Sequence, residues 1–308
     1  MSESGLSNPS IPICQGPNPD PGKPKLLIPA GSCDCHAHIF GPADRYPFTS
    51  NRSYTPPEAS IEAYRRMLGA LGFDRAVIVQ PSVYGMDNRC TGAAVRASNA
   101  SWRGVAVMTA DVKESVLVDL HSAGFRGVRL NLLFKGGMAL DELERIAHVI
   151  EPFGWHVQLL LDGRELDQLA DRFRRLPVDI VIDHIGHMPA TVGVNHPGFQ
   201  TLLQLTREGR CWVKLSGAYR VSGERFPYND VVPFARALVE TAPDRLVFGT
   251  DWPHPAVNGF IPQDASLLDL LPLWAPDEDV QYRILVTNPE RLYDFPRAPE
   301  NSSMAPKR

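Results

Sequence analysis

Short apolar runs alternate with longer amphipathic stretches along most of the chain, from about residue 31 to residue 297. The short runs are nearly continuous and rich in β-branched residues, as at Ala76–Val79, which is typical of parallel strands that are covered on both faces. Eight of them predict strands, at Ser32–Ile39, Arg75–Gln80, Gly104–Met108, Gly127–Leu132, Trp155–Leu161, Asp179–Asp183, Cys211–Ser216 and Arg245–Thr250. The amphipathic stretches predict helices, at Pro57–Leu71, Asn88–Ala100, Lys113–Ala123, Leu140–Pro152, Gly163–Arg175, Pro197–Glu208, Asp230–Glu240 and Ala265–Trp274.

This alternation predicts an α/β protein whose single folded domain, residues 31–297, is a (β/α)8 TIM barrel. A division into two domains would need a linker, and no stretch rich in Gly, Ser or Pro lies near the middle of the chain. A last helix near Asp277–Leu285, followed by Thr287–Pro289, is expected to close the chain over the barrel.

The two ends of the chain lack the alternating pattern. Residues 1–30 are expected to form a mostly irregular arm, and residues 298–308 a flexible polar tail. The first 24 residues contain no basic segment leading into an apolar one, so they do not resemble a signal peptide. No apolar run approaches the roughly 20 residues that span a bilayer. We therefore expect a cytoplasmic protein with no membrane contact.

Net charge and cysteine content narrow the possible partners. A net charge of −4 gives no broad basic surface for a nucleic acid. The five cysteines are odd in number and scattered, which predicts reduced thiols rather than a disulfide framework. A small molecule is the expected partner, and the sequence leaves the oligomeric state open.

Polar residues gather where the predicted strands end. Because barrel enzymes carry their active sites at the carboxyl ends of the strands, these residues are candidates for chemistry. They are His36 and His38 after the first strand, Ser82 after the second, Arg129 and Asn131 on the fourth, His184 after the sixth, Arg220 after the seventh and Asp251 after the eighth.

The histidines and Asp251 are the candidates for catalysis. His36 and His38 are two residues apart, so both can point into the barrel mouth from one face of a strand; a hydrogen-bonded structural pair is the alternative. His184 could instead satisfy a loop carbonyl. Asp251 could cap a helix, but Pro253 and Pro255 argue against a helix that begins there. A carboxylate among histidines is a good general base.

Three cations are expected near the same mouth: Arg129, Lys135 and Arg220. Lys135 could simply be solvated, but Arg129 interrupts an apolar strand, where an unpaired charge is costly. No acidic strand-end residue other than Asp251 is clearly placed to pair with these cations, so a bound carboxylate is one natural partner for Arg129. Tyr54 could add a hydroxyl contact, although tyrosines more often serve packing.

Five motifs together resemble a known family. They are Cys33–Pro42 (CDCHAHIFGP), Arg126–Arg129 (RGVR), Asp183–Gly186 (DHIG), Gly249–Pro255 (GTDWPHP) and Asn288–Tyr293 (NPERLY). Their combination is similar to the branch of the amidohydrolase superfamily that contains the 2-pyrone-4,6-dicarboxylate hydrolases, and the likeness runs from about Pro29 to Pro296.

The resemblance implies a barrel hydrolase that opens a small carboxylated lactone without a metal. By match to the motifs, Asp251 would take a proton from water, and His36, His38 and His184 would hydrogen-bond the lactone carbonyl. Substrate carboxylates would be held by Arg129 and Arg220. Ser82, Tyr54, Asn131 and Lys135 would complete the substrate-binding set.

Three positions depart from that pattern. Lys135 stands where the family is expected to have Arg, Leu160 where it has Tyr, and Tyr84 where it has His. Lys lacks the planar bidentate fork of Arg, so these changes leave open which lactone is bound, including sugar-acid and muconate-type lactones.

A metal cofactor is not expected. Many amidohydrolases hold divalent ions, but the fourth strand offers Arg129 rather than a bridging Lys, and His156 lies at the start of the fifth strand, at the other end of the barrel. A single Zn²⁺ on His36, His38, His184 or Asp251 fits by ligand type, yet the three nearby cations would oppose it.

Two other functions use the same residues. A lactone isomerase of the galactarolactone type would move the ring closure between hydroxyls instead of admitting water. A non-enzymatic binder of an anionic small molecule would explain the cations but gives no reason for Asp251 to lie among histidines.

Overall fold

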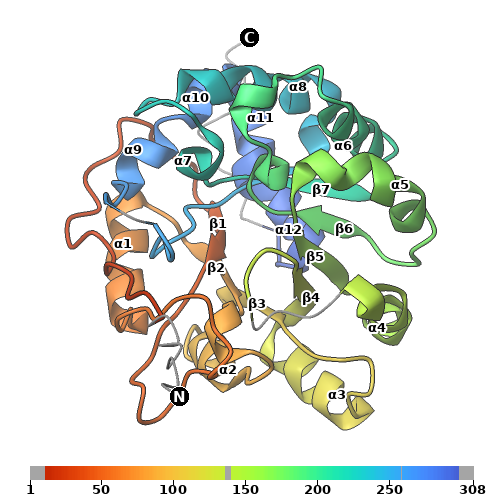
Figure 1. Ribbon diagram of the computed structural model, residues 1–308. Coiled ribbons are helices and arrows are strands. Elements are labelled where there is room, and N and C mark those ends of the chain that lie inside the picture. Colours follow the sequence, from red (N-terminus) through yellow and green to blue (C-terminus); the bar gives the residue numbers. More distant parts are fainter. Residues whose placement is uncertain (1–10, 136–139, 258, 298–308) are drawn as a thin grey trace, which may run out of the picture.

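A computed structural model describes residues 11–135, 140–257 and 259–297. Within them, eight parallel strands stand side by side in chain order, and helices surround them (Figure 1). The strands are β1 (Cys33–Ala37), β2 (Arg75–Val79), β3 (Trp102–Ala106), β4 (Phe125–Asn131), β5 (His156–Leu160), β6 (Ile180–Ile182), β7 (Cys211–Leu215) and β8 (Leu246–Phe248). The fold is therefore the predicted TIM barrel.

The barrel closes between its first and last strands at the carboxyl end. The His38 amide donates a hydrogen bond to the Trp252 carbonyl at 2.8 Å, and the Asp251 amide donates to the His36 carbonyl at 2.8 Å. Closure therefore joins the two segments on which the candidate histidines and Asp251 lie.

The main helices lie outside the strands and in the predicted places. They are α1 (Ile61–Leu71), α2 (Arg89–Arg96), α3 (Glu114–Ala123), α4 (Leu143–Ile150), α5 (Leu166–Arg174), α6 (Pro197–Arg207) and α8 (Val232–Thr241). Helix α1 shows why such a segment folds: Tyr64, Met67, Leu68 and Leu71 bury one face, at the spacing that an amphipathic helix requires.

The chain after β7 departs from the prediction. A short helix, α7 (Ala218–Val221), follows β7 at once, and the helix expected at Ala265–Trp274 is broken into α9 (Asp264–Leu268) and α10 (Leu271–Trp274). The last predicted helix does not end at Leu285. Instead α11 (Glu278–Tyr282) passes through a wider turn into α12 (Asn288–Tyr293). Pro289 does not stop the helix because it lies at the first turn of α12, where no backbone N–H is needed.

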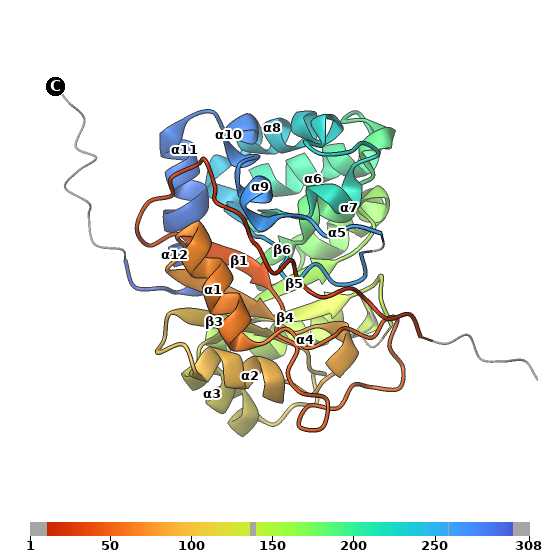
Figure 2. The ribbon, with the colours of Figure 1, turned by 90° about the vertical axis from the view of Figure 1, so that its left-hand side faces the viewer.

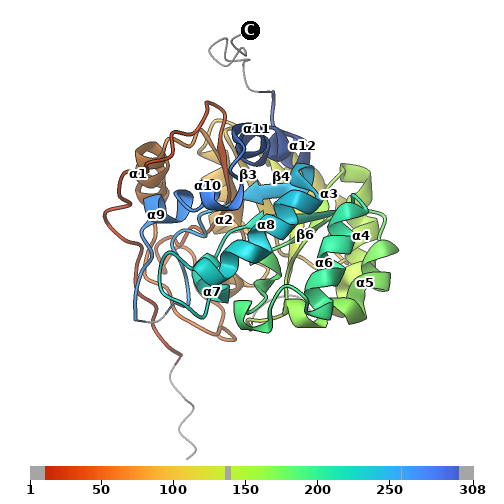
Figure 3. The same ribbon diagram turned by 90° about the horizontal axis from the view of Figure 1, so that it is seen from above.

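Helix α12 covers the amino-terminal end of the barrel. Asn288 donates from Nδ2 to the carbonyl of Leu246 at the start of β8, and Arg103 of β3 donates to the Tyr293 carbonyl. Figure 3 shows α11 and α12 at the end of the molecule opposite α7. The other end is therefore left for the site.

The described part of the N-terminal arm, residues 11–30, is largely irregular and lies along the barrel wall, past α1 and α9 (Figure 2). The Ala265 amide donates to the Pro21 carbonyl, and Asp269 accepts from the amides of Lys25 and Leu26. The predicted tail at 298–308 lies outside the described residues. No helix in the described part of the chain is long and apolar enough to cross a membrane.

Candidate active site

The candidate site lies at the carboxyl ends of the strands, where the loops leave a cavity of about 20 Å³. That volume holds about one water molecule. The cavity is lined by His38, Tyr54, Arg129, Asn131, Phe134, Leu160, His184, His187, Arg220, Asp251 and Pro255.

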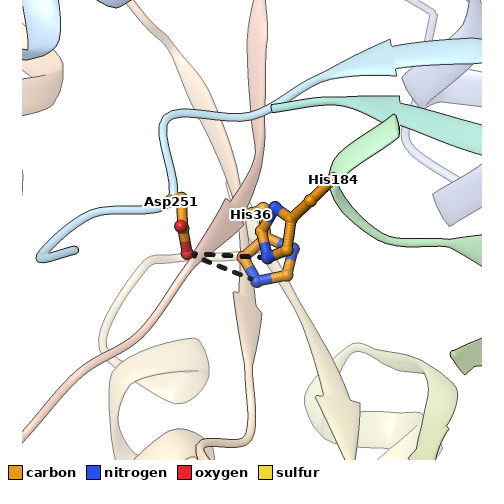
Figure 4. A group of neighbouring side chains, drawn as sticks. All are labelled: His36, His184 and Asp251. Carbon is orange, nitrogen blue, oxygen red and sulfur yellow. Dashed lines mark ion pairs between the residues drawn. The ribbon is translucent and has the colours of Figure 1, made fainter. Parts of the chain in front are cut away.

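Asp251 faces three imidazoles with one of its two oxygens. Its Oδ1 lies 3.8 Å from Nε2 of His36 and 3.9 Å from Nε2 of both His38 and His184. Figure 4 shows His36 and His184 converging on Asp251 from β1 and from the loop after β6. Neither Oδ1 nor the His36 Nε2 has a hydrogen-bond partner within the described structure. A single water can therefore bridge these atoms.

A bulge in β1 gives both histidines their inward orientation. The register of β1 against β2 shifts between Asp34 and Ala37. The side chain of Cys35 packs in the cluster of buried residues inside the barrel, and the side chain of the next residue, His36, contacts Lys214, also inside the barrel. Consecutive residues of a regular strand would point to opposite faces. Bulges of this kind re-aim side chains next to active sites.

The second oxygen of Asp251 is fully engaged. Oδ2 accepts from the Tyr219 hydroxyl at 2.6 Å and from Nε of Arg220 at 2.5 Å. Burial would raise the pKa of Asp251, but Arg220 and the facing imidazoles outweigh it and hold that pKa well below its ordinary value. The carboxylate is therefore charged, with Oδ2 fixed and Oδ1 free to take a proton.

The partners of each Nδ1 distinguish the three histidines. His38 Nδ1 lies 2.7 Å from the Val79 carbonyl, which can only accept, so a neutral His38 presents an Nε2 lone pair. His36 Nδ1 lies 3.2 Å from the Asp183 carboxylate, which accepts, and 3.2 Å from Nζ of Lys214, which donates, so these contacts suit either tautomer of a neutral His36. His184 Nδ1 lies 2.9 Å from the Ser216 hydroxyl, which can donate, so a neutral His184 can carry its proton on Nε2. Burial lowers the pKa of all three imidazoles.

A network of charges underlies the histidines. Asp183 accepts from Arg129 at 3.1 Å and from Gln158 at 2.9 Å, and it lies 3.6 Å from Nζ of Lys214. Burial would raise the Asp183 pKa, but His36, Lys214 and Arg129 hold it well below its ordinary value. Lys214 is fully buried, and burial lowers its pKa.

This network corrects the expectation that no strand-end acid other than Asp251 pairs with the cations. Asp183 at the end of β6 pairs with Arg129, and Asp251 itself pairs with Arg220. The sequence does not show either pair, because the partners are 31 and 54 residues apart and meet only when the barrel closes. Arg129 retains a buried Nε with no partner in the described residues.

The other predicted binding residues occupy different places. Tyr54 lines the cavity, and burial, partly offset by the Ser82 hydroxyl, raises its pKa to about 12. Ser82 is buried beside it. Asn131 also lines the cavity, but its Oδ1 accepts from the amides of Leu133 and Phe134 and shapes the loop. Lys135 is exposed and does not line the cavity.

Sequence reasoning missed several residues of the site. Lys214 interrupts the apolar strand β7 as Arg129 interrupts β4, so the same argument from the cost of burying a charge would have found it. Tyr219 precedes Arg220 on α7, a helix too short to leave a periodic pattern. His187 lines the cavity from a loop, and no sequence signal singled it out.

The residues facing Asp251 also suit a divalent cation. Atoms of His36, His184 and Asp251 lie within 4.8 Å of one another, and they are the nitrogen and oxygen ligands that zinc accepts. Buried lone pairs on His36 and on Oδ1 have no partner in the described residues. By ligand chemistry these three side chains fit a single ion.

Comparisons with known proteins identify the family. The family model described as Amidohydrolase matches residues 33–295. The chain belongs to the amidohydrolase family. It is 41% identical to a 2-pyrone-4,6-dicarboxylate hydrolase of Comamonas testosteroni over 89% of this chain and 93% of that protein.

Two further relatives widen the range of activities. The chain is 38% identical to a 4-sulfomuconolactone hydrolase of Hydrogenophaga intermedia, over 95% of this chain and 98% of that protein. It is 33% identical to a D-galactarolactone isomerase of Agrobacterium fabrum, over 88% of this chain and 93% of that protein. All three relatives are named for reactions of lactones.

Proposed function

We propose that this amidohydrolase is a lactonase that hydrolyses a small anionic lactone. One observation carries the proposal: a charged, buried Asp251 has one oxygen fixed and the other free, and the free oxygen faces three imidazole nitrogens at 3.8–3.9 Å. A binding protein would gain nothing from this arrangement, because an anionic ligand is repelled by a carboxylate.

The side chains support a complete hydrolytic cycle. A water in the cavity donates to Asp251 Oδ1 and to Nε2 of His38. His184 donates from Nε2 to the lactone carbonyl and stabilises the oxyanion that forms. Asp251 takes the water proton as the hydroxide oxygen bonds to the carbonyl carbon. The C–O bond of the ring then breaks, and Asp251 returns the proton to the leaving oxygen, so that a hydroxy acid is released.

The cavity favours an anionic substrate. Arg129 and Arg220 both line it, and each retains donor capacity beyond its single carboxylate partner. Leu160 and His187 also line the cavity, and Lys135 does not, so a planar dicarboxylate is not held by the expected set of groups. We expect a lactone with one carboxylate or an aliphatic ring to react faster than 2-pyrone-4,6-dicarboxylate.

We further propose that the reaction needs no metal. Three cations, Arg129, Arg220 and Lys214, already surround two carboxylates, Asp183 and Asp251, so added positive charge is opposed. If an ion were held by His36, His184 and Asp251, it would supply polarisation of the lactone carbonyl.

We also propose a cytoplasmic location. The five buried cysteines form no disulfide, which supports a reducing compartment.

The decisive experiment is Asp251→Asn, assayed on a panel of lactones carrying one or two carboxylates. Loss of a general base costs about 10² to 10⁴ in kcat, and Asn keeps the shape of the side chain, so ligand binding should persist. Asp171→Asn on the exposed face of α5 is the control. If Asp251→Asn kept more than half of the wild-type kcat, Asp251 would not be the base.

Lactone isomerisation is the second candidate, favoured by the similarity to a galactarolactone isomerase. The same Asp251 could move a proton between hydroxyls of the substrate instead of from water. Turnover in ¹⁸O-labelled water distinguishes the two reactions. Hydrolysis places one labelled oxygen in the carboxylate of the product, whereas an isomerised lactone carries none.

A further inference from the structure

A chain of buried hydrogen bonds extends from Asp251 away from the cavity. The Tyr219 hydroxyl, 2.6 Å from Asp251 Oδ2, also lies 3.0 Å from Nδ1 of His254, and His254 Nε2 lies 3.0 Å from Oδ1 of Asp264. All four side chains are at most 9% exposed. The chain ends on α9, so it connects the loop after β8, α7 and α9.

Counting hydrogens shows that this chain has two arrangements. As a carboxylate Asp264 only accepts, so the proton between it and His254 then lies on Nε2, and a neutral His254 offers a lone pair at Nδ1. The phenol of Tyr219 has a single proton and two acceptors, Asp251 Oδ2 and His254 Nδ1. It can satisfy one of them at a time.

The charge on Asp251 decides between the two acceptors. While Asp251 is a carboxylate, it is the stronger acceptor and draws the phenol proton. Once Oδ1 has taken a proton from water, Oδ2 becomes a carbonyl oxygen and a weaker acceptor, and His254 Nδ1 is the better partner. The phenol O–H bond stays intact throughout, since only its direction changes.

We propose that Tyr219, His254 and Asp264 are positioning residues that let the phenol hydrogen bond switch from Asp251 to His254 as Asp251 takes its proton. A permanent donor on Oδ2 would favour the charged carboxylate and so oppose proton uptake. An alternative acceptor behind the tyrosine removes the tyrosine's share of that opposition, while Arg220 keeps its contact with Oδ2. The inference rests on the proposed role of Asp251 as base, and it holds for hydrolysis or isomerisation.

Kinetics of three variants test the switch. His254→Leu removes the second acceptor, and we expect kcat to fall about 10-fold or more with KM nearly unchanged, because hydrogen bonds to charged groups are the strong ones. His254→Asn places an amide oxygen near the position of Nδ1 and should restore most of kcat. Tyr219→Phe in the His254→Leu background removes the donor that is then fixed on Asp251 Oδ2, so it should recover part of kcat rather than add a second loss.

A second measurement is independent of turnover. In protein labelled with ¹⁵N-histidine, the His254 signals, assigned by their loss in His254→Asn, should show a proton on Nε2 and none on Nδ1. Asp264→Asn should weaken that preference. A proton on Nδ1 of wild-type His254, or additive kinetic losses in the double variant, would overturn the switch. An enzyme inactive on every lactone would instead count against the proposed function and leave the NMR result to decide the switch.

Discussion

The two oxygens of Asp251 have separate tasks, and the separation is set by neighbouring side chains. Tyr219 and Arg220 hold Oδ2, while Oδ1 faces the imidazoles without a partner in the described residues. The imidazoles differ in turn because a carbonyl faces Nδ1 of His38, a carboxylate and the Lys214 ammonium face Nδ1 of His36, and a hydroxyl faces Nδ1 of His184. Chemical roles at this site therefore follow from hydrogen-bond partners rather than from residue type alone.

Substitution of Arg129 tests the preference for anionic substrates. Arg129→Met should raise KM for a carboxylated lactone about 30-fold or more, the cost of losing one partner of a buried charge pair. The fold should persist, because Asp183 keeps Gln158, His36 and Lys214. Arg126→Met, at the start of the same strand and paired with Asp294, is the control. Neutral lactones that match the carboxylated ones in rate would show that the arginines serve the structure alone.

Chelation tests the absence of a metal requirement. Purified protein treated with excess chelator and passed through a desalting column should keep its kcat, because the proposed donors and the base are all side chains. The metal content of the same sample should be measured to verify that no ion remains bound. Activity that disappears and returns with one equivalent of Zn²⁺ would show that His36, His184 and Asp251 hold a required ion.

Short irregular elements, rather than the long helices, position the site. The bulge in β1 turns His36 and His38 inward, and α7 directs the consecutive residues Tyr219 and Arg220 to the same carboxylate. Asp251 and His254 adopt left-handed backbone angles, with φ of 66° and 61°, which cost energy in non-glycine residues. The regular helices supply the rigid frame that maintains these conformations.

The capping of α1 gives a test of that frame. The Ser60 hydroxyl accepts from the Ala63 amide at 3.2 Å, whereas Lys113, at the start of α3, makes no side-chain cap. Ser60→Ala should lower the free energy of unfolding by about 1 kcal/mol, measured by urea denaturation, and Lys113→Ala should leave it within about 0.5 kcal/mol. Equal losses in the two variants would contradict the capping role.

The barrel as a whole has one end that carries the candidate site and one that α12 covers, and buried ionisable groups lie toward both. His156, at the start of β5, is 2% exposed and packs against the ring of Tyr293 on α12. Neither of its ring nitrogens has a partner within the described structure. Burial lowers its pKa to about 3, so the folded state holds it neutral.

The buried His156 makes the free energy of unfolding depend on pH. The unfolded state protonates His156 below its ordinary pKa, near 6.5, while the folded state does so only near 3. Stability is therefore lost as pH falls between these values, by about 4 kcal/mol. Asp34 has the opposite effect on stability, because burial raises its pKa to about 6 and its folded form therefore gains stability as pH falls. This contribution is the same in the wild type and in a variant of His156.

His156→Gln isolates the effect. Its free energy of unfolding, measured by urea titration at pH 7, 5 and 4, should fall less steeply with acid than that of the wild type. His148→Gln, which changes an exposed histidine on α4, should follow the wild-type curve. A His156→Gln curve parallel to wild type would mean that this histidine is not held neutral.

The sequence by itself determined the architecture and most of the candidate residues. Hydrophobic periodicity is a local property of the sequence, so it located the eight strands and the main helices. The polar residues at the carboxyl ends of those strands could then be assigned to the same end of the barrel before their contacts were known. The sequence did not locate the ends of a helix where local signals conflict. Pro289 is typical of a helix end, but it lies in the first turn of α12, which packs against β8 through Asn288.

Only the tertiary structure decided how the charges pair and which atoms are free. Asp183 and Arg129 are 54 residues apart, and Tyr219 of α7 and Asp264 of α9 meet the loop of Asp251 and His254 in one chain of hydrogen bonds. Pairing across a barrel depends on register, on a one-residue bulge and on short loops, and none of these leaves a periodic pattern in the chain. Hydrogen-bond partners in turn fix proton positions, and so the chemistry, because a buried donor or acceptor without a partner is costly.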